Sequence, residues 1–105
     1  MKYNYNEGNL TVELEEELDM HACKILRNVI DGYIMKYQPT EFEMDLSKVK
    51  FMDSSGIGLI MGRYNLVKLM DSKFVIVNPS NSIKRILCPS ENAWEVYDNI
   101  LQVVE

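Results

Sequence analysis

The sequence has few of the residues that build covalent or metal-bound scaffolds. It contains two cysteines, Cys23 and Cys88, which lie far apart and form no CxxC pattern, and a single histidine, His21. A disulfide framework or a zinc site is therefore not expected. Free cysteines are among the most buried residues of proteins, so we expect two buried or half-buried thiols. His21 has no matching nucleophile or second metal ligand in the sequence, and we expect it to be solvated at the start of a helix.

Long apolar runs and an excess of positive charge are also absent. No stretch reaches the ~18 apolar residues that span a bilayer, and the polar N-terminus does not resemble a signal peptide. Lysines and arginines number 11 against 16 aspartates and glutamates, which gives a formal net charge of −5. This charge disfavours nonspecific binding to nucleic acid or to an anionic membrane. We therefore expect a cytoplasmic protein whose partner carries a basic docking surface.

Motifs for nucleotide binding and for serine hydrolysis are missing as well. The chain has neither a Walker loop nor a glycine-rich dinucleotide loop, so we expect no nucleotide and no other cofactor. A Gly-x-Ser-x-Gly motif with a plausible general base is not found, which disfavours a small hydrolase with a serine nucleophile. The sequence therefore predicts a protein that is not an enzyme.

The rest of the composition is that of an ordinary globular domain. Hydrophobic residues make up 47% of the chain and charged residues 26%, and the length of 105 residues suits one domain with a modest core. The apolar patterns predict strands over residues 2–6, 10–14, 42–46 and 74–77, helices over 20–37 and 54–70, a short helix after 78–80 and a terminal helix through 104. This order predicts a mixed sheet with helices packed on it, joined by right-handed crossovers.

Both long helices carry apolar stripes at helical spacing. The stripe expected to face the core contains Ala22, Ile25, Leu26, Val29, Ile30 and Tyr33 in the first helix and Ile57, Ile60, Met61, Tyr64 and Val67 in the second. A further stripe of Leu59, Leu66 and Met70, with Arg63 among them, either packs against neighbouring helices or forms an exposed docking patch. Gly58 and Gly62 either admit a closely packed helix or only lighten the packing. The acidic run at 13–17 is either a solvated strand edge or a contact for a basic partner.

The turn before the second helix is the most informative segment. Residues 51–58 read Phe-Met-Asp-Ser-Ser-Gly-Ile-Gly. Asp53 stands in the N-cap position, so Ser54 and Ser55 fall in the first turn of the helix. Unpaired N–H groups and the positive end of the helix dipole can accommodate a phosphate there. Gly56 and Gly58 carry no side chains that could cover the hydroxyls, so a neighbouring protein could approach closely.

This segment, extended by Gly-Arg-Tyr at 62–64, resembles the phosphorylation-site segment of the anti-sigma factor antagonists, single STAS domains of bacterial partner-switching systems. It is most similar to the antagonists of the sporulation sigma factor F. Two further pieces match in the right order, one at 17–19 with the helix that follows and one at 83–87. The resemblance implies an α/β fold, the STAS fold, with a mixed sheet of four to five strands and helices packed on it, formed by the whole chain, 1–105.

In this family the second serine of Asp-Ser-Ser-Gly is phosphorylated by an anti-sigma factor that is itself a serine kinase, and the resemblance carries this role to Ser55. It implies a protein that binds the kinase when unphosphorylated, is released on phosphorylation, and is reset by a PP2C-type phosphatase. The positions expected at the partner interface are Asp19, His21, Asp53, Ser54, Gly56, Ile57, Gly58, Leu59, Gly62 and Arg63. An alternative is a STAS scaffold or switch module for a client other than a sigma-factor system, such as a stressosome.

The sequence departs from the family pattern in two places. Glu16 stands where family members commonly have a glycine, so the turn into the first helix could differ. Residues 88–92 contain no glycine, where the family usually has a small Ser-Gly or Thr-Gly turn, and the tail that follows is short. We therefore expect the final strand of the family fold to be missing or vestigial, and a helix with Trp94, Tyr97, Ile100, Leu101 and Val104 on one face.

Overall fold

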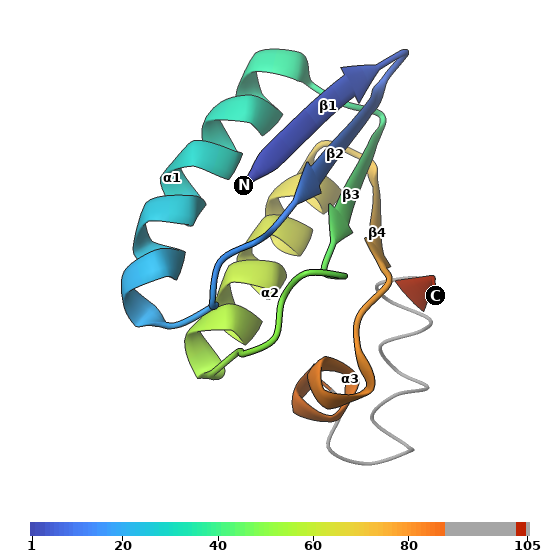
Figure 1. Cartoon of the computed structure of the whole chain (residues 1–105). Coiled ribbons are helices and arrows are strands. Elements are labelled where there is room, and N and C mark those ends of the chain that lie inside the picture. Colours follow the sequence, from blue (N-terminus) through green and yellow to red (C-terminus); the bar gives the residue numbers. More distant parts are fainter. Residues whose placement is uncertain (88–102, 105) are drawn as a thin grey trace.

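The computed structural model describes residues 1–87 and 103–104. Its elements, in chain order, are β1 (Lys2–Asn6), β2 (Asn9–Glu13), α1 (Met20–Tyr37), β3 (Glu41–Asp45), α2 (Ser54–Leu69), β4 (Lys73–Val77), α3 (Asn81–Leu87) and β5 (Val103–Val104) (Figure 1). The order predicted from the sequence is confirmed through α3. Among the residues described, no helix has both the length and the apolar character needed to cross a membrane.

The strands form one mixed sheet in the order β1-β2-β3-β4-β5. β1 runs antiparallel to β2, and each later neighbour is parallel to the strand before it. A two-residue turn joins β1 to β2, with φ of 49° at Glu7 and 87° at Gly8. Two positive φ values are typical of the tight turns that match the twist of a hairpin, which explains the turn signal in the sequence.

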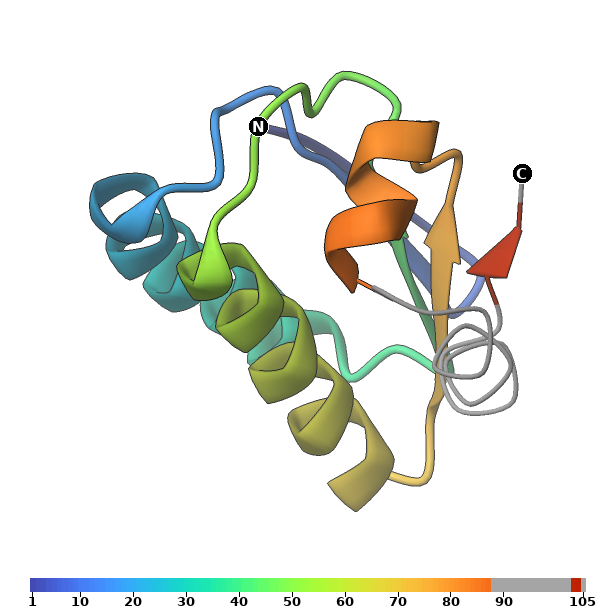
Figure 2. The same cartoon turned by 90° about the horizontal axis from the view of Figure 1, so that it is seen from below.

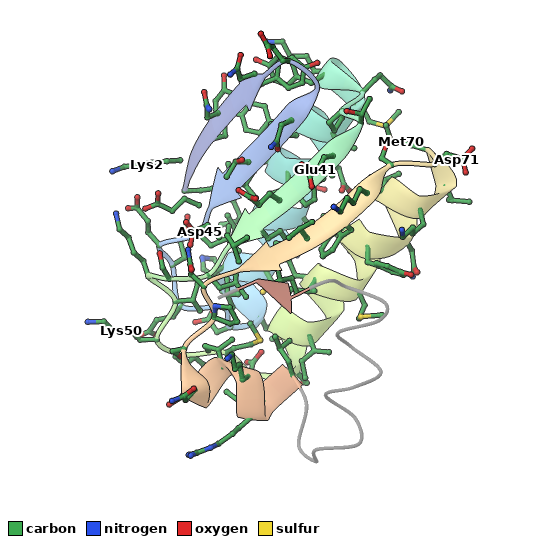
Figure 3. All side chains as sticks on the ribbon, turned by 90° about the vertical axis from the view of Figure 1, so that its right-hand side faces the viewer. Lys2, Glu41, Asp45, Lys50, Met70 and Asp71 are labelled. Atoms are coloured by element: carbon green, nitrogen blue, oxygen red, sulfur yellow. The ribbon has the colours of Figure 1, made fainter. Side chains whose placement is uncertain are left out.

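Aligned rows of apolar side chains form the core face of the sheet. Leu10 is in register with Phe42, and Phe42 with Phe74, so one buried row crosses three strands. The rings of Phe42 and Phe74 have centroids 5.6 Å apart. α1 and α2 lie side by side over this face (Figures 1 and 2). On the opposite face β2 and β3 carry polar side chains, including Glu41 and Asp45 (Figure 3), as the alternation in the sequence predicts. On β4 the residues of that face are Val75 and Val77, which are buried.

α1 begins and ends close to the predicted residues, but its buried face is rotated from the predicted stripe. The buried residues are Cys23, Leu26, Ile30 and Ile34. Ile25 and Val29, which were expected in the core, are 54% and 40% exposed. The prediction was wrong at these two positions because the helix has more apolar positions than one face can bury, and the sequence does not say which of them faces the sheet.

α2 is buried on two sides because it contacts both α1 and β4. Leu59 and Ile60 are buried, whereas Ile57, Met61 and Tyr64 are partly buried and pack against the core. Leu66 and Met70 also pack against it. Of the two alternatives for the stripe that contains Leu59, packing within the protein is therefore confirmed, and an exposed docking patch is wrong.

The C-terminal region contains a short final strand. Val103–Val104 pairs in parallel with Ile76 and Val77 of β4, so the final strand is present but only two residues long. Val104 was expected in a terminal helix, and that prediction is wrong. The rest of the expected helix, together with Cys88 and Pro89, lies outside the described residues.

Candidate functional site

The loops that lead into α1 and α2 are tied together at one end of the sheet. Leu18 and Met52 form a parallel bridge. The amide of Leu18 donates to the Phe51 carbonyl at 3.0 Å, and the amide of Asp53 donates to the Leu18 carbonyl at 3.2 Å. Because β2 and β3 are parallel neighbours, both helices start at the same edge of the sheet. The bridge therefore brings the two helix N-termini together.

An aspartate caps each of these helices. Asp19 Oδ1 accepts a hydrogen bond from the Ala22 amide at 2.9 Å, and Asp53 Oδ1 accepts one from the Ser55 amide at 2.7 Å. Both caps have extended backbone angles, as N-cap residues typically do. The predicted capping role of Asp53 is confirmed, and Ser54 and Ser55 lie in the first turn of α2. Ser54 is exposed, whereas Ser55 is half-buried.

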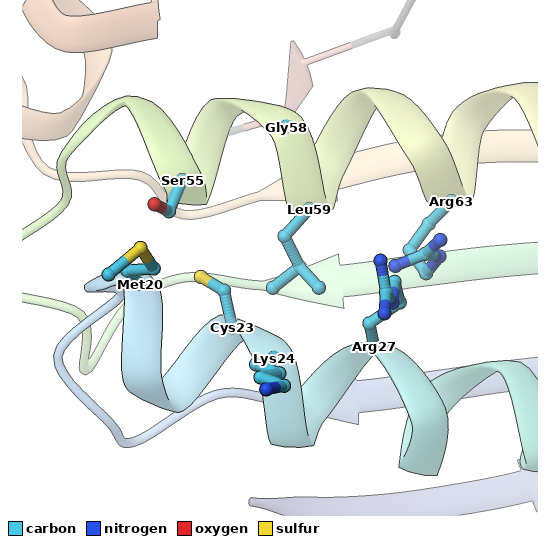
Figure 4. Close-up of a pocket in the computed structure, with 8 residues that line it drawn as sticks. All are labelled: Met20, Cys23, Lys24, Arg27, Ser55, Gly58, Leu59 and Arg63. Atoms are coloured by element: carbon cyan, nitrogen blue, oxygen red, sulfur yellow. The ribbon is translucent and has the colours of Figure 1, made fainter.

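Ser55 opens onto a groove between α1 and α2 (Figure 4). We call this space, of about 450 Å³, the interhelical groove. It is lined by Met20, Cys23, Lys24 and Arg27 of α1 and by Ser55, Gly58, Leu59 and Arg63 of α2. In the close-up the Ser55 hydroxyl lies near the end of the groove where both helices begin, and the two arginines lie further along.

The charges around the groove are unevenly distributed. Arg63 is buried, and its Nε lies 2.8 Å from Asp31 Oδ1. Burial lowers the pKa of Arg63, Asp31 opposes that effect, and the positive charge of Arg27 adds to it. At the other end, burial raises the pKa of the Cys23 thiol, and the nearby carboxylates of Asp53 and Asp19 raise it further. Cys23 is thus a buried thiol with a raised pKa, and its burial is as expected for the first of the two cysteines.

Two glycines of the motif serve different purposes. A Cβ on Gly56 would collide with the Met52 side chain and come within 3.1 Å of Leu18 Cβ. Gly56 is therefore needed where α2 packs on the bridged loops. A Cβ on Gly58 or Gly62 would meet nothing within 4 Å in the described chain. There is therefore free space at both positions, and at Gly58, one turn from Ser55, it opens onto the groove.

The residues predicted at the interface divide into accessible and buried groups. His21, Ser54 and Gly58 are exposed, and Asp19, Asp53, Ile57 and Gly62 are half-buried. His21 is solvated near the helix start, as expected. Leu59 and Arg63, by contrast, are only 4% and 7% exposed, and Gly56 is buried too. These three offer a partner little surface and instead support the shape of the site.

Sequence reasoning missed the α1 side of the groove. Met20, Lys24 and Arg27 line it at helical spacing after the Asp19 cap, but nothing in the sequence indicates which face of α1 meets α2. The acidic run proves to be engaged in ion pairs: Glu13 pairs with Lys48 at 2.7 Å and Glu15 with Lys2 at 3.6 Å. Within residues 1–87 and 103–104, no group of three or more His, Cys, Asp or Glu side chains could hold a metal ion.

Glu16 takes part in the loop that leads into α1. Its Oε1 accepts a hydrogen bond from the Glu15 amide at 3.0 Å, and its Oε2 lies 3.1 Å from the amino group of Met1. The backbone hydrogen bonds of the Glu15 amide and the contact with Met1 lower the pKa of Glu16 against the effect of its partial burial. The carboxylate therefore has a local role at the position where the family commonly has glycine.

Comparison with known proteins identifies the family. The profile of the STAS domain matches residues 1–97. The chain is similar to the anti-sigma F factor antagonist of Paenibacillus polymyxa, with 31% identity over 101 residues, which cover 94% of this chain and 86% of the relative. Among solved structures it is similar to the anti-sigma factor antagonist SpoIIAA in its unphosphorylated form, at 22% identity and a TM-score of 0.77, over 99% of this chain and 87% of the other.

A second solved structure, of the Bacillus cell fate determinant SpoIIAA in the phosphorylated form, matches at 22% identity and a TM-score of 0.75, over 99% of this chain and 90% of the other. The structural likenesses confirm the predicted STAS fold. Together with the family profile and the sequence identity, they show that the chain belongs to the STAS-domain family of anti-sigma factor antagonists.

Proposed function

We propose that this chain, as a single STAS domain over 1–105, is a phosphorylation-controlled partner-switching protein of the cytoplasm. Unphosphorylated, it binds an anti-sigma factor that is a serine kinase, and so frees a sigma factor for transcription. The kinase phosphorylates Ser55, and the modified chain is released. A PP2C-type phosphatase restores the binding form.

The observation that carries this proposal is the placement of Ser55. Its amide is held by the Asp53 cap at 2.7 Å, so the serine has a fixed position in the first turn of α2. Its hydroxyl opens onto the interhelical groove, and Gly58, one turn further along, leaves the surface beside it uncovered. A kinase active site needs such a fixed and approachable hydroxyl.

The negative charge that phosphorylation adds would explain why the modified chain is released from its partner. A phosphoserine carries about −1.5 to −2 charges at neutral pH. On Ser55 this charge would lie beside the Asp53 carboxylate, on a chain whose formal net charge is already −5. A partner surface that fits a neutral hydroxyl would lose favourable contacts and gain repulsion.

A pull-down from lysate of the source bacterium tests the proposal. The wild-type chain should capture a protein identified by mass spectrometry as an anti-sigma factor with a serine-kinase domain. Ser55→Asp should lose that protein, and the matched control Ser54→Asp, with the same charge one residue away, should retain more of it. If the two variants behave alike, or no such kinase is captured by the wild type, the proposal fails.

A further inference from the structure

The interhelical groove contains more positive charge than the described residues neutralise. Lys24 and Arg27 enter it from α1, and Arg63 enters it from α2. Among the described residues Asp31 is the one carboxylate paired with any of the three, and it pairs with Arg63. Lys24 and Arg27 are exposed and have no ion-pair partner in this part of the chain. An acidic protein thus has a local basic groove that its candidate phosphorylation site also lines.

Arg63 provides a second observation, a buried hydrogen-bond donor without an acceptor in the described part of the chain. Its side chain is 8% exposed. Nε forms an ion pair with Asp31 Oδ1 at 2.8 Å, whereas Nη1 has no hydrogen-bond partner among the described residues. Buried guanidinium groups are normally hydrogen-bonded, because an unmade bond in a buried site is costly. The open Nη1 donor of Arg63 therefore favours an acceptor in the groove.

The helices α1 and α2 tilt their side chains toward the same end of the groove. α1 and α2 start at the same sheet edge and run the same way (Figure 2). Side chains of an α-helix lean toward its N-terminus, which is the Ser55 end of the groove for both helices. Figure 4 shows Arg27 and Arg63 reaching into the groove from opposite sides. Both arginines line the same groove, and the positive charge of Arg27 contributes to the lowered pKa of Arg63.

We propose that the interhelical groove binds the phosphate group of phosphorylated Ser55, with Lys24 and Arg27 pairing with its oxygens and Arg63 completing the positive lining. This inference rests on the proposed phosphorylation of Ser55 and adds where the phosphate goes. Arginine and lysine form short, charge-assisted hydrogen bonds with phosphate oxygens. The phosphate neutralises two exposed cations that line the groove and fills the space beside Gly58. The open surface and the positive charges of the groove are then no longer available to the partner.

The test uses full-length protein with phosphoserine installed at position 55 during synthesis, so that no kinase is needed. The proton affinity of the phosphate is read from the pH dependence of its phosphorus NMR signal. Because nearby positive charge favours the dianion, Arg27→Gln and Lys24→Gln should each raise that affinity about three- to tenfold. Lys36→Gln removes the same charge from the last turn of α1, far from the groove, and should leave it unchanged.

Equal proton affinities in the wild type, Lys24→Gln and Arg27→Gln would overturn the inference. A second arm titrates unphosphorylated protein with inorganic phosphate. The inference would also be overturned if inorganic phosphate bound saturably in a way that depends on Arg27, while Arg27→Gln left the proton affinity of phosphoserine 55 unchanged. That result would mean that the groove binds a diffusible oxyanion. Because phosphoserine is introduced without the kinase, failure of this inference is separate from failure of the proposed partner switch, which the pull-down decides.

Discussion

Ser54 and Ser55 are adjacent hydroxyls that a kinase would meet in different surroundings. They point about 100° apart around α2. Ser54 is exposed, and Ser55 faces the interhelical groove. A partner that binds over the groove and the open surface at Gly58 would reach Ser55. The position of the hydroxyl, and not the exposed fraction of the side chain alone, would then decide which serine is phosphorylated.

We therefore predict that the cognate kinase phosphorylates Ser55 and not Ser54. Mass spectrometry after incubation with kinase and ATP should find the phosphate on Ser55. Ser54→Ala should be modified nearly as well as the wild type, and Ser55→Ala should not be modified. Undiminished incorporation in Ser55→Ala would disprove the assignment.

Asp53 holds the first turn of α2 through its bond to the Ser55 amide. We predict that Asp53→Ala lowers the free energy of unfolding by about 1 kcal/mol, the usual cost of losing an N-cap. Chemical denaturation measures this loss. Asp53→Ser keeps a capping oxygen without the charge and should restore most of the stability. If Asp53→Ala unfolds at the wild-type denaturant concentration, the cap contributes nothing, and any defect in phosphorylation belongs to the interface.

Two glycines of α2 have different roles: Gly56 allows close packing of the helix, and Gly58 leaves the surface near Ser55 accessible. Gly56→Ala should lower the free energy of unfolding by about 1–3 kcal/mol, because the added methyl group overpacks the contact with Met52 and Leu18. Gly58→Ala should raise it by up to about 1 kcal/mol, because the methyl group meets open space and alanine is the better helix former. Thermal or chemical denaturation of the pair measures both signs.

The same pair tests whether the surface at Gly58 is used for binding. If it is, Gly58→Ala should weaken binding of the kinase although it stabilises the fold. Full binding by this variant would exclude close approach at Gly58, and a stabilised Gly56→Ala would show that the packing account of that residue is wrong.

The sequence predicts where helices and strands begin and end better than it predicts which face of a helix is buried. The Asp19 and Asp53 caps give local chemical signals, and the alternation in β2 and β3 fixes which side chains enter the core. The burial of Ile34 instead of Ile25 and Val29 depends on how α1 is oriented on the sheet. The orientation of α1 on the sheet results from packing between segments that are distant in the sequence, and no local pattern encodes it.

The same contrast between local signals and long-range packing applies to the residues of the candidate site. The serine and its cap belong to one continuous segment, so the sequence revealed them. Lys24 and Arg27 come from another helix and reach the site only because Leu18 and Met52 join the two loops. The burial of Arg63 and its pairing with Asp31 likewise arise from helix packing. The sequence placed Arg63 among the interface positions and left open whether its stripe is packed or exposed.

For the whole molecule, phosphorylation should change the charge more than the shape. A phosphate in the first turn of α2 meets the favourable end of the helix dipole and the cations of the groove, so little strain is expected. We predict that amide chemical shifts of the phosphorylated and free forms differ mainly around 53–58 and along the groove at Lys24 and Arg27. Shifts spread across the whole sheet would instead indicate release through a global conformational change.

The affinity of the purified anti-sigma kinase for the two forms of the chain tests the central claim most directly. Calorimetric titration compares unmodified protein with full-length protein that carries phosphoserine at position 55, after circular dichroism has shown that both are folded. We expect phosphorylation to weaken binding more than 100-fold, which corresponds to a loss of about 3 kcal/mol of binding free energy. Equal dissociation constants for the two folded forms would contradict the account.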